Sequence, residues 1–565
     1  MTSETTARTV EQATREWWKE AVFYQVYPRS FNDTDGDGIG DLPGITERAD
    51  YLADLGVDAV WLCPIYESPQ RDNGYDISDY RAIDDRFGDL GDFDELLSAL
   101  HDRNIRLVMD LVVNHTSDAH EWFQRSRRGE PPYDEYYIWR EGDPETPPNN
   151  WESIFGGSAW SYDDHRGAWY LHLFGEHQPD LNWRSPAVRD AITDVTEWWL
   201  DRGIDGFRID AVSHIAKAEG LPDGDPDSTL VGSEQFTHAP GFEEYLTELC
   251  AVFDGYDAVS VGELGRTSIE ETAAYTGAEG PGLDVPFQFD HVHAGYDPAN
   301  VFDPTIPTEW DFQTFKRTLA TQQRSIPWPA VFFSNHDLPR LVSRIGDDEA
   351  YRRESATVIA TALLTLRGTP FVYQGDEIGM RNVSFESLAD VDDAMAVGQV
   401  RALLEEGRID TAAVGLAAVN EWSRDHSRTP MQWTDGPNAG FTDGEPWLPI
   451  GADYESVNVE AARADERSIW HYYRDLIALR SEEDVLVYGD FELYYPDHES
   501  VFAYTRSLAG DRVLVALNWA GKPVTESVPD GIDRDTATLL VGNYADADGR
   551  DLLDLRPWDA RVYRL

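Results

Sequence analysis

The sequence predicts an α/β protein: a (β/α)8 barrel with a lid domain inserted after the third strand and a C-terminal antiparallel β domain. Three features predict this fold. Eight short apolar runs rich in β-branched and aromatic residues recur along the chain, amphipathic stretches separate them, and two intervals are too long for a simple barrel. Strands that alternate with helices favour a parallel sheet, and eight such units close into a TIM barrel.

The predicted elements follow one another regularly. The eight strands span residues 21–27, 58–63, 105–112, 204–210, 258–263, 283–289, 330–335 and 370–374. The crossover helices include residues 44–55, 93–103, 186–202, 241–253, 310–322 and 349–366, and a further helix spans 469–481. Because the carboxyl ends of all barrel strands open onto one face, polar residues at these ends are expected to meet there.

The two long intervals define the predicted domains. Residues 116–180, rich in Trp, Tyr, Pro and Gly, form the inserted lid domain, so the barrel comprises 1–115 and 181–484. Residues 376–450 form a long insertion after the eighth strand, and long insertions usually carry function. From residue 485 to 565 the runs SVFAYTRS and DRVLVALNWAG alternate as antiparallel strands do, which predicts a small C-terminal β-sandwich domain.

Composition and charge restrict the classes of partner. Hydrophobic residues make up 41% of the 565 residues and aromatic residues 12%, which is enough for an extensive core and excludes global disorder. A net charge of −59, spread along the chain, makes nucleic acid and anionic membranes unfavourable partners. Lysine occurs only at Lys19, Lys217, Lys316 and Lys522. So acidic and lysine-poor a surface indicates a salt-loving organism, and we expect folding or activity to need molar salt.

Cysteine usage and hydropathy indicate a cytoplasmic protein. The two cysteines, Cys63 and Cys250, are expected to be buried thiols, because two residues make no disulfide framework. The first twenty residues contain no apolar signal segment, and no apolar span reaches 18 residues. We therefore expect a cytoplasmic location and a monomer or small homo-oligomer.

The segment GFRIDA at residues 206–211 reads as a buried strand that ends on a carboxylate. A desolvated Asp210 costs several kcal/mol unless it is paired. Arg208, two residues earlier on the same face, can hold it ionised, and an ionised, oriented carboxylate is what a covalent nucleophile requires. A structural ion pair inside a core is the alternative for an isolated Arg-x-Asp sequence.

Other strand ends carry similar residues. The third predicted strand leads into Asp110 and Asn114-His115, the fifth ends at Glu263, and the seventh ends in the Ser-Asn-His-Asp sequence that closes at Asp337. Each alone would more often be a helix cap or a loop carboxylate. Their joint placement at one face of the barrel predicts a single site.

These blocks identify a family resemblance. DLVVNH, GFRIDAVSH, VGELG and FSNHD resemble the conserved regions of the α-amylase superfamily of glycoside hydrolases. QPDLNW at 178–183, RTPMQW at 428–433 and the opening AVFYQVYPRSFNDTDGDGIGDL are similar to the oligo-1,6-glucosidase and α-glucosidase branch. The resemblance covers nearly the whole chain.

The resemblance implies that Asp210 is the nucleophile, Glu263 the general acid/base, and Asp337 a third carboxylate that grips the sugar hydroxyls. Arg208 would keep Asp210 charged. Glu263, with apolar neighbours and no obvious cationic partner, is expected to have a raised pKa. A retaining glycosidase needs one carboxylate ionised and the other protonated.

The resemblance also implies a set of substrate-binding residues: Tyr75, Asp76, His115, Arg208, His214, His336 and Arg428. The histidines of DLVVNH and FSNHD would hydrogen-bond the sugar in the first subsite. Asp76 and Arg428 would close the pocket around the non-reducing end, and Tyr75 would lie under this sugar. Arg424, close to Arg428 in the sequence, is the alternative arginine.

A Gly-rich loop after the first strand offers hard oxygen ligands. Its candidate metal ligands are Asp33, Asp35, Asp37, Asp41 and the carbonyl group of Ile39. The spacing matches the start of an EF-hand, but the twelfth position is Gly44 instead of a bidentate Glu. A structural Ca²⁺ or Mg²⁺, remote from catalysis, is the prediction, and a solvated acidic loop is the alternative. No organic cofactor is expected.

The function implied is an exo-acting retaining α-glucosidase. Its expected substrates are maltose, sucrose-like glucosides and short malto-oligosaccharides. In this branch a valine after the nucleophile resembles α-1,6-specific enzymes, whereas Ala211 resembles α-1,4-active ones. The alternatives are an oligo-1,6-glucosidase and a transglucosylase of the trehalose synthase or sucrose isomerase type, although GELGRT after the acid/base is more similar to hydrolytic enzymes. A transporter-associated, non-catalytic relative would need a membrane anchor, which we do not expect.

Overall fold

The computed structural model describes residues 15–277, 280, 282–545 and 552–565. Eight parallel strands form the central barrel, in the order β11-β10-β9-β5-β2-β1-β13-β12. They are β1 (Phe23–Val26), β2 (Ala59–Leu62), β5 (Arg106–Val112), β9 (Gly206–Asp210), β10 (Val259–Leu264), β11 (Val285–Gln288), β12 (Ala330–Val331) and β13 (Thr369–Tyr373). The predicted barrel is confirmed, and each predicted strand overlaps one of these eight.

Helices cover the outside of the barrel. They include α2 (Leu42–Glu47), α3 (Ala49–Leu55), α4 (Leu90–His101), α6 (Pro186–Arg202), α8 (Phe242–Phe253), α10 (Phe312–Ser325), α12 (Arg352–Thr365) and α17 (Ile469–Glu482). All five positions of β9 are buried because the strand is covered on both faces, and its two charged residues, Arg208 and Asp210, pair with each other. Helix α6 begins with Pro186 in its first turn and ends at Gly203, whose φ of 107° is left-handed.

Two predicted elements differ from the structure. The predicted helix 44–55 is divided into α2 and α3 at Arg48, which leaves the helical conformation and donates two hydrogen bonds to Asn32 Oδ1. The predicted strand 330–335 ends at Val331. Beyond it the chain turns, and Asn335 Oδ1 accepts the backbone N–H of Asp337 at 2.8 Å. This turn places the polar Ser-Asn-His-Asp sequence at the mouth of the barrel.

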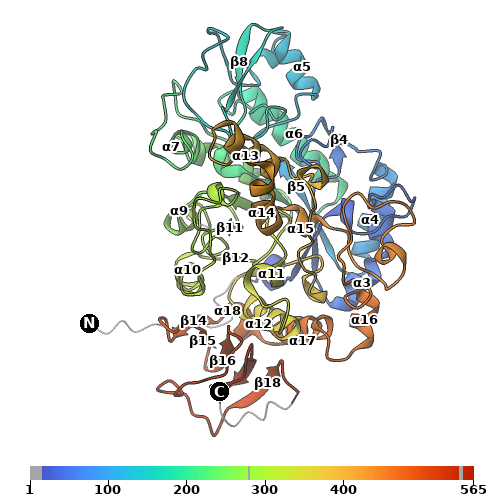
Figure 1. Ribbon diagram of the computed structural model, residues 1–565, viewed down its shortest axis with the longest axis vertical. Helices are drawn as coiled ribbons and strands as arrows, with labels where there is room; N and C mark the ends of the chain where they lie inside the picture. The colour runs from blue at the N-terminus through green and yellow to red at the C-terminus, as the bar shows by residue number, and fades with distance from the viewer. Residues whose placement is uncertain (1–14, 278–279, 281, 546–551) are drawn as a thin grey trace.

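A lid lies at one end of the molecule (Figure 1). It contains α5 (Glu121–Arg127) and the three-stranded antiparallel sheet of β6 (Trp139–Arg140), β8 (Ala168–Leu171) and β7 (Trp160–Asp163). Helix α13 (Ala394–Glu405) and helix α14 (Ala412–Trp422) of the insertion after β13 form an apolar cluster of their own, and α13 touches the lid. Gln399 Nε2 donates to the carbonyl oxygen of Ile154 at 3.3 Å.

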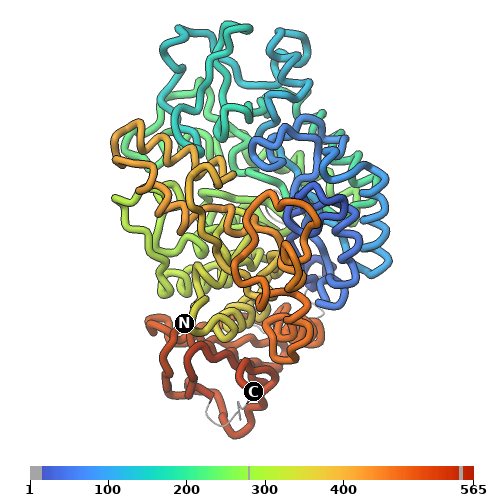
Figure 2. Tube along the Cα trace, turned by 45° about the vertical axis from the view of Figure 1, so that its right-hand side comes forward, coloured from blue at the N-terminus to red at the C-terminus, as the bar shows by residue number. Residues whose placement is uncertain are grey.

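The C-terminal part forms a separate antiparallel sheet at the opposite end, as Figure 2 also shows from another side. Its order is β14 (Asp490–Tyr494), β15 (Val501–Leu508), β16 (Asp511–Asn518), β20 (Ala560–Arg564) and β18 (Thr538–Gly542), with β17 (Val524–Thr525) and β19 (Asp554–Leu555) as an extra pair. Lys316 of α10 joins this sheet to the barrel, because its ammonium group donates to three backbone carbonyls between β14 and β15.

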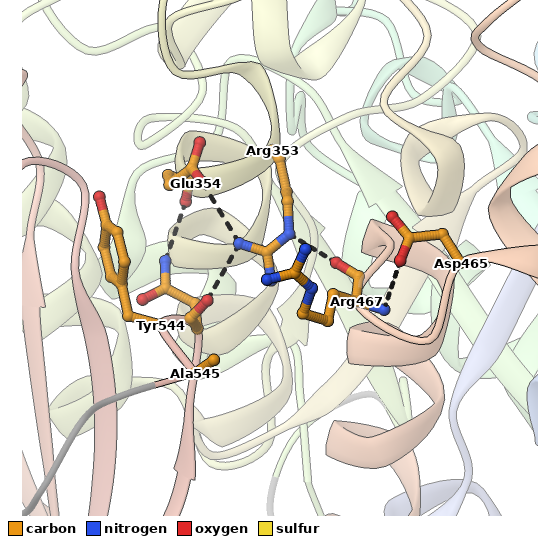
Figure 3. A pocket seen from close by; sticks show the side chains of 7 residues that line it. Arg353, Glu354, Asp465, Arg467, Tyr544 and Ala545 are labelled. Atoms are coloured by element: carbon orange, nitrogen blue, oxygen red, sulfur yellow. Dashed lines mark hydrogen bonds and ion pairs between the residues drawn. The ribbon is translucent and has the colours of Figure 1, made fainter.

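A polar cleft of about 270 Å³ lies where the start of α12 meets the C-terminal sheet (Figure 3). Arg353 crosses it and donates to the carbonyl groups of Arg467 and Asn543. Its other neighbour is Glu354, 3.3 Å away. The cleft is therefore bridged by contacts between the two domains. In the described part of the chain, no helix is long and apolar enough to cross a membrane.

Candidate active site

The strand ends meet around the guanidinium group of Arg208, which is only 2% exposed. Its Nη1 lies 2.5 Å from Asp110 Oδ1 and 2.7 Å from Asp210 Oδ1, and its Nη2 lies 3.1 Å from Glu263 Oε2. Ala211 donates its backbone N–H to the same Glu263 oxygen at 2.7 Å. Three carboxylates from β5, β9 and β10 thus share one cation.

The expected contrast between Asp210 and Glu263 is wrong in two respects: Glu263 does have a cationic partner, and the pKa of Asp210 is raised as well. Arg208 reaches both because the neighbouring strands β9 and β10 place the two carboxylates on either side of its guanidinium. Burial raises the pKa of both carboxyl groups, and Arg208 opposes this in each case. The two groups therefore titrate as a coupled pair.

Asp110, which is fully buried, completes the site. Trp61 Nε1 and the Tyr75 hydroxyl donate to Asp110 Oδ2 at 2.9 and 3.1 Å. The Tyr75 ring stacks on His336, with centroids 5.3 Å apart and the planes 6° from parallel. Each ring therefore covers one face of the other, and this stack lies beside Asp110.

Asp337, beyond the seventh strand, lies beside one imidazole and two guanidinium groups. Its oxygens lie 3.2 Å from His336 Nε2, 3.3 Å from Arg424 Nη1 and 2.9 Å from Arg428 Nη2. Although burial opposes it, these neighbours hold the pKa of Asp337 well below its ordinary value. Asp337 therefore remains ionised.

A cavity of about 620 Å³ opens above these groups. Glu263, Asp337 and Arg424 line its polar part, and Phe155 and Phe174 of the lid line it as well. The volume suits a ligand of disaccharide size, since pockets for small molecules range from about 300 to 1,000 Å³. The site thus combines paired carboxylates with an open cavity that has both polar and apolar walls.

Comparison with known proteins gives the family. The model described as "Alpha amylase, catalytic domain" matches residues 25–489, and the model "Maltogenic Amylase, C-terminal domain" matches residues 491–562. The chain belongs to the alpha-amylase family of glycoside hydrolases.

Individual relatives match over almost their full length. An oligo-1,6-glucosidase of Parageobacillus thermoglucosidasius is 45% identical over 98% of this chain and 99% of its own. A trehalose-6-phosphate hydrolase of Escherichia coli is 42% identical over 96% of this chain and 98% of its own. Among solved structures, the trehalulose synthase MutB from Pseudomonas mesoacidophila is 40% identical, with a TM-score of 0.92 over 98% of this chain and 100% of its own.

The family resemblance implied that Asp76 and Arg428 close the pocket, but neither is among the residues that line the cavity in the structure. Both oxygens of Asp76 accept hydrogen bonds within its own turn, from the Ser68 hydroxyl and the backbone N–H groups of residues 71 and 72. Arg428 Nε donates to the His336 carbonyl, behind Asp337. Instead Asp72 Oδ1 lies 3.4 Å from Arg424 Nη2, and Arg424 lines the cavity. Sequence alone does not separate Asp72 from Asp76, since both lie in the motif DNGYD.

The two remaining histidines differ in their surroundings. His115 is 1% exposed, and its Nε2 lies 3.1 Å from Gln178 Nε2 and 3.2 Å from the Tyr75 carbonyl. Gln178 in turn donates to Asp72 at 2.9 Å, so His115 belongs to the same network as the Asp72–Arg424 pair. His214 lines the cavity near Glu263.

The Asp72–Arg424 pair predicts a pH-dependent KM. Burial raises the pKa of Asp72 to about 6, with Arg424 opposing. Below pH 6 the carboxylate takes up a proton and loses its charge-assisted bonds, so KM for maltose should rise as the pH falls through this value. Asp72→Asn should lower kcat/KM about 100-fold and abolish this rise of KM at low pH. Initial rates between pH 4.5 and 8 measure both.

The matched control for this prediction is Asp76→Asn. Since Asp76 accepts three local hydrogen bonds, its amide should lower the melting temperature more than Asp72→Asn does and leave the pH dependence of KM in place. A KM that depends on Asp76 and is indifferent to Asp72 would reverse the assignment.

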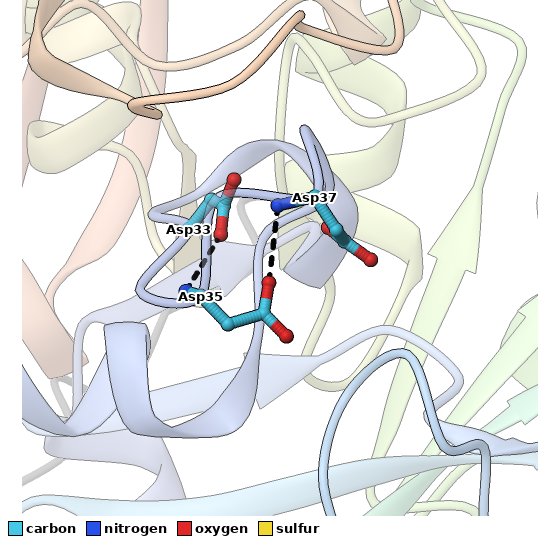
Figure 4. Close-up of side chains that lie close together, drawn as sticks. All are labelled: Asp33, Asp35 and Asp37. Carbon is cyan, nitrogen blue, oxygen red and sulfur yellow. Dashed lines mark hydrogen bonds between the residues drawn. The ribbon is translucent and has the colours of Figure 1, made fainter.

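The acidic loop after β1 brings three of its carboxylates together (Figure 4). One oxygen of each of Asp33, Asp35 and Asp37 lies within 4.8 Å of the others. Asp35 and Asp37 donate backbone N–H groups to the preceding aspartate of the series. The backbone N–H of Ile39 donates to Asp37, which keeps this residue in the same loop.

Asp41, the fourth predicted carboxylate ligand, lies apart from this group. It is the N-cap of α2, where Oδ1 accepts the Gly44 N–H at 2.6 Å and Oδ2 accepts the backbone N–H and the hydroxyl group of Thr34. The helix N-terminus therefore takes this side chain. The oxygen donors of Asp33, Asp35 and Asp37 fit a hard cation such as Ca²⁺ or Mg²⁺.

Proposed function

We propose that the protein is an exo-acting, retaining α-glucosidase that releases glucose from the non-reducing end of short α-glucosides. The observation that carries this proposal is the sharing of Arg208 by Asp210 and Glu263 at the ends of adjacent strands. Binding to the two nitrogens of one guanidinium keeps the carboxylates close together, as retaining glycosidases require.

The two carboxylates have different free oxygens. Asp210 uses Oδ1 for Arg208, and no hydrogen bond to its Oδ2 is found among the described residues. This oxygen attacks the anomeric carbon and forms the glucosyl ester. Glu263 uses Oε2 for Ala211 and Arg208, which leaves Oε1 to carry the proton. Glu263 protonates the leaving oxygen and then deprotonates the water that hydrolyses the ester.

Asp337 and Arg424 account for exo action. Asp337, which is held ionised, accepts hydrogen bonds from hydroxyl groups of the glucosyl ring in the transition state. The Asp72–Arg424 pair, with the guanidinium 5.4 Å from the centre of the Phe155 ring, forms a wall at one side of the cavity. A closed wall limits the glucose side to one sugar unit.

Ala211 supports α-1,4 specificity. It lines the cavity beside Glu263, and its φ of 46° places it in the left-handed region that β-branched residues avoid. Ala211→Val should therefore lower kcat/KM for maltose about 10-fold and shift the preference towards isomaltose, since one or two methyl groups in a pocket change discrimination by roughly 10- to 200-fold. Parallel kinetics on maltose and isomaltose measure the ratio. An unchanged ratio would remove Ala211 as a determinant of linkage.

The α-1,6 alternative has support of its own. The relative at 45% identity carries the name oligo-1,6-glucosidase. Trehalose-6-phosphate hydrolysis has less support, although a relative at 42% identity bears that name. On the side of the cavity away from Arg424, the lining includes a second arginine, Arg266, whose Nη2 lies 4.0 Å from Asp297 Oδ1. Asp297 already faces this guanidinium, which disfavours a phosphate group there.

The direct test incubates the enzyme in high salt with maltose, isomaltose, sucrose, trehalose, trehalose-6-phosphate and starch, and separates the products. Glucose from maltose at the highest kcat/KM, with trehalose-6-phosphate at least 100-fold poorer, is the expected result. Rearranged disaccharides without free glucose would mean that the enzyme isomerises disaccharides and does not hydrolyse them. Products longer than glucose from starch would contradict exo action.

The proposal includes a structural Ca²⁺ or Mg²⁺ held by Asp33, Asp35 and Asp37. A ligand at 100 times its Kd adds about 2.7 kcal/mol to the free energy of unfolding. CaCl2 or MgCl2 should therefore raise the melting temperature above its value in EDTA at matched ionic strength, and Asp35→Ser should remove this difference. Exposed Asp164→Ser, in the turn between β7 and β8, is the control for loss of one surface charge. Equal melting temperatures in EDTA and in both cations would reject the metal site.

A further inference from the structure

Asp393, a carboxylate outside the strand ends, holds Arg424. It precedes α13 in the insertion after β13, and its exposed fraction is 0%. Its Oδ1 accepts Arg424 Nε at 2.7 Å, and its Oδ2 accepts the backbone N–H of Arg424 at 2.9 Å. Both the side chain and the backbone of Arg424 are thus fixed by one carboxylate.

The three acids around Arg424 lie at unequal distances. Asp393 makes the 2.7 Å contact at Nε, whereas Asp337 lies 3.3 Å from Nη1 and Asp72 lies 3.4 Å from Nη2. A short charge-assisted contact fixes the plane of a guanidinium group. The longer contacts on the sugar side leave the two Nη groups available for sugar hydroxyls.

Asp393 also lies at the start of α13, a helix that forms part of the cavity wall. Its Oδ1 accepts the backbone N–H groups of Met395 at 3.1 Å and Ala396 at 3.3 Å, so it is the N-cap of α13. Met395 and Gln399 of this helix line the cavity. A Cβ atom at Gly398 would lie 2.7 Å from the Phe155 carbonyl oxygen, so α13 packs closely against the lid. One buried carboxylate therefore joins the helix α13 to the arginine at the glucose side.

We propose that Asp393 is a positioning residue: it orients Arg424 for the non-reducing sugar and sets the start of α13 against the lid, without touching substrate. This inference rests on the proposed function, because it assigns Arg424 to sugar binding. Arg424, acting against burial, holds the pKa of Asp393 below its ordinary value, so the pair remains charged across the working range.

A double-mutant cycle tests whether Asp393 acts through Arg424. The four proteins are wild type, Asp393→Asn, Arg424→Ala and the double variant, and kcat and KM for maltose are measured in each. Asparagine is a good N-cap but carries no charge, so α13 should persist. Asp393→Asn should lower kcat/KM 30- to 100-fold, mainly through KM, and the double variant should be within about 2-fold of Arg424→Ala alone.

The matched control is Asp89→Asn, at the N-cap of α4. This helix also has 12 residues, and Asp89 accepts the N–H groups of Gly91 and Asp92 without an arginine partner. Its kcat/KM should stay within 2-fold of wild type. Should Asp393→Asn fail to fold, Asp393→Ser keeps a capping oxygen and replaces it in the cycle.

Additive losses in the cycle, or an unchanged kcat/KM in Asp393→Asn, would overturn the inference. The same four proteins are titrated with D-glucose by calorimetry, where the losses of affinity should show the same non-additivity. A wild type that binds glucose but hydrolyses no α-glucoside rejects the proposed function alone, and the glucose cycle still decides the role of Asp393. A wild type that binds no glucose and has no activity rejects both.

Discussion

Asp210→Asn should reduce the hydrolysis of maltose roughly 10⁵- to 10⁶-fold, because loss of a covalent nucleophile has about this cost. Asparagine keeps the shape of the side chain and one oxygen for Arg208, whose Nη1 lies 2.7 Å from Asp210 Oδ1. The melting temperature should therefore fall little. Initial rates on maltose and a thermal melt of the same preparation separate catalysis from folding.

Asp110→Asn is the matched control for this substitution. Asp110 binds the same guanidinium nitrogen but is fully buried, so its amide should lower stability more and kcat less than Asp210→Asn does.

A stereochemical experiment tests the nucleophile role independently. With azide, Asp210→Gly should give the β-glucosyl azide by one displacement, and Glu263→Ala should give the α-azide by two. Near-normal turnover by Asp210→Asn, or the α-azide from Asp210→Gly, would remove Asp210 from the nucleophile role.

Arg208→Met should be the most destabilising single substitution in the site. It leaves three carboxylates without the cation that they share, and removal of one partner from a buried ion pair costs about 3–5 kcal/mol of unfolding free energy. Loss of the positive charge also raises the pKa of Asp210 and Glu263 further. Both limbs of the pH profile of kcat/KM should then move to higher pH, and activity at pH 7 should fall because Asp210 is protonated there. Urea unfolding and the pH profile measure the two effects.

Arg480→Met separates a general loss of buried arginine from this electrostatic role. Arg480 is 1% exposed and donates only to backbone carbonyl groups among its described partners, in the interior between α12 and α17. Its loss should lower stability without moving the pH profile. The account of Arg208 fails if the pH profile of Arg208→Met coincides with that of the wild type.

The barrel was predictable because burial on both faces of parallel strands leaves continuous apolar runs. Strand β2, whose sequence AVWL is buried at all four positions, is of this kind, and helix α6 was predicted to the residue because proline and glycine mark its ends. The helices α13 and α14 were not predicted. The insertion that contains them has no strand beside them, so the alternation of strands and helices that located the barrel helices gave no guide here. The expected need for molar salt stays a prediction, based on the charge of −59 and the scarcity of lysine.

Within the site, the residue types at the strand ends could be predicted, but the partners of long side chains could not. Arg208 reaches two neighbouring strands, so Glu263 gains a cation that sequence spacing does not reveal. Asp72 and Asp76 differ only in which one is occupied by its own turn, which depends on the backbone conformation of the loop. The same competition assigns Asp41 to a helix N-terminus instead of the acidic cluster.

The most direct measurement for the central claim is the anomeric form of the first glucose released from maltose, followed by proton NMR before mutarotation. The paired carboxylates on Arg208 predict α-glucose, since two displacements at the anomeric carbon retain its configuration. Initial release of β-glucose would mean a single displacement by water and would contradict the covalent role of Asp210.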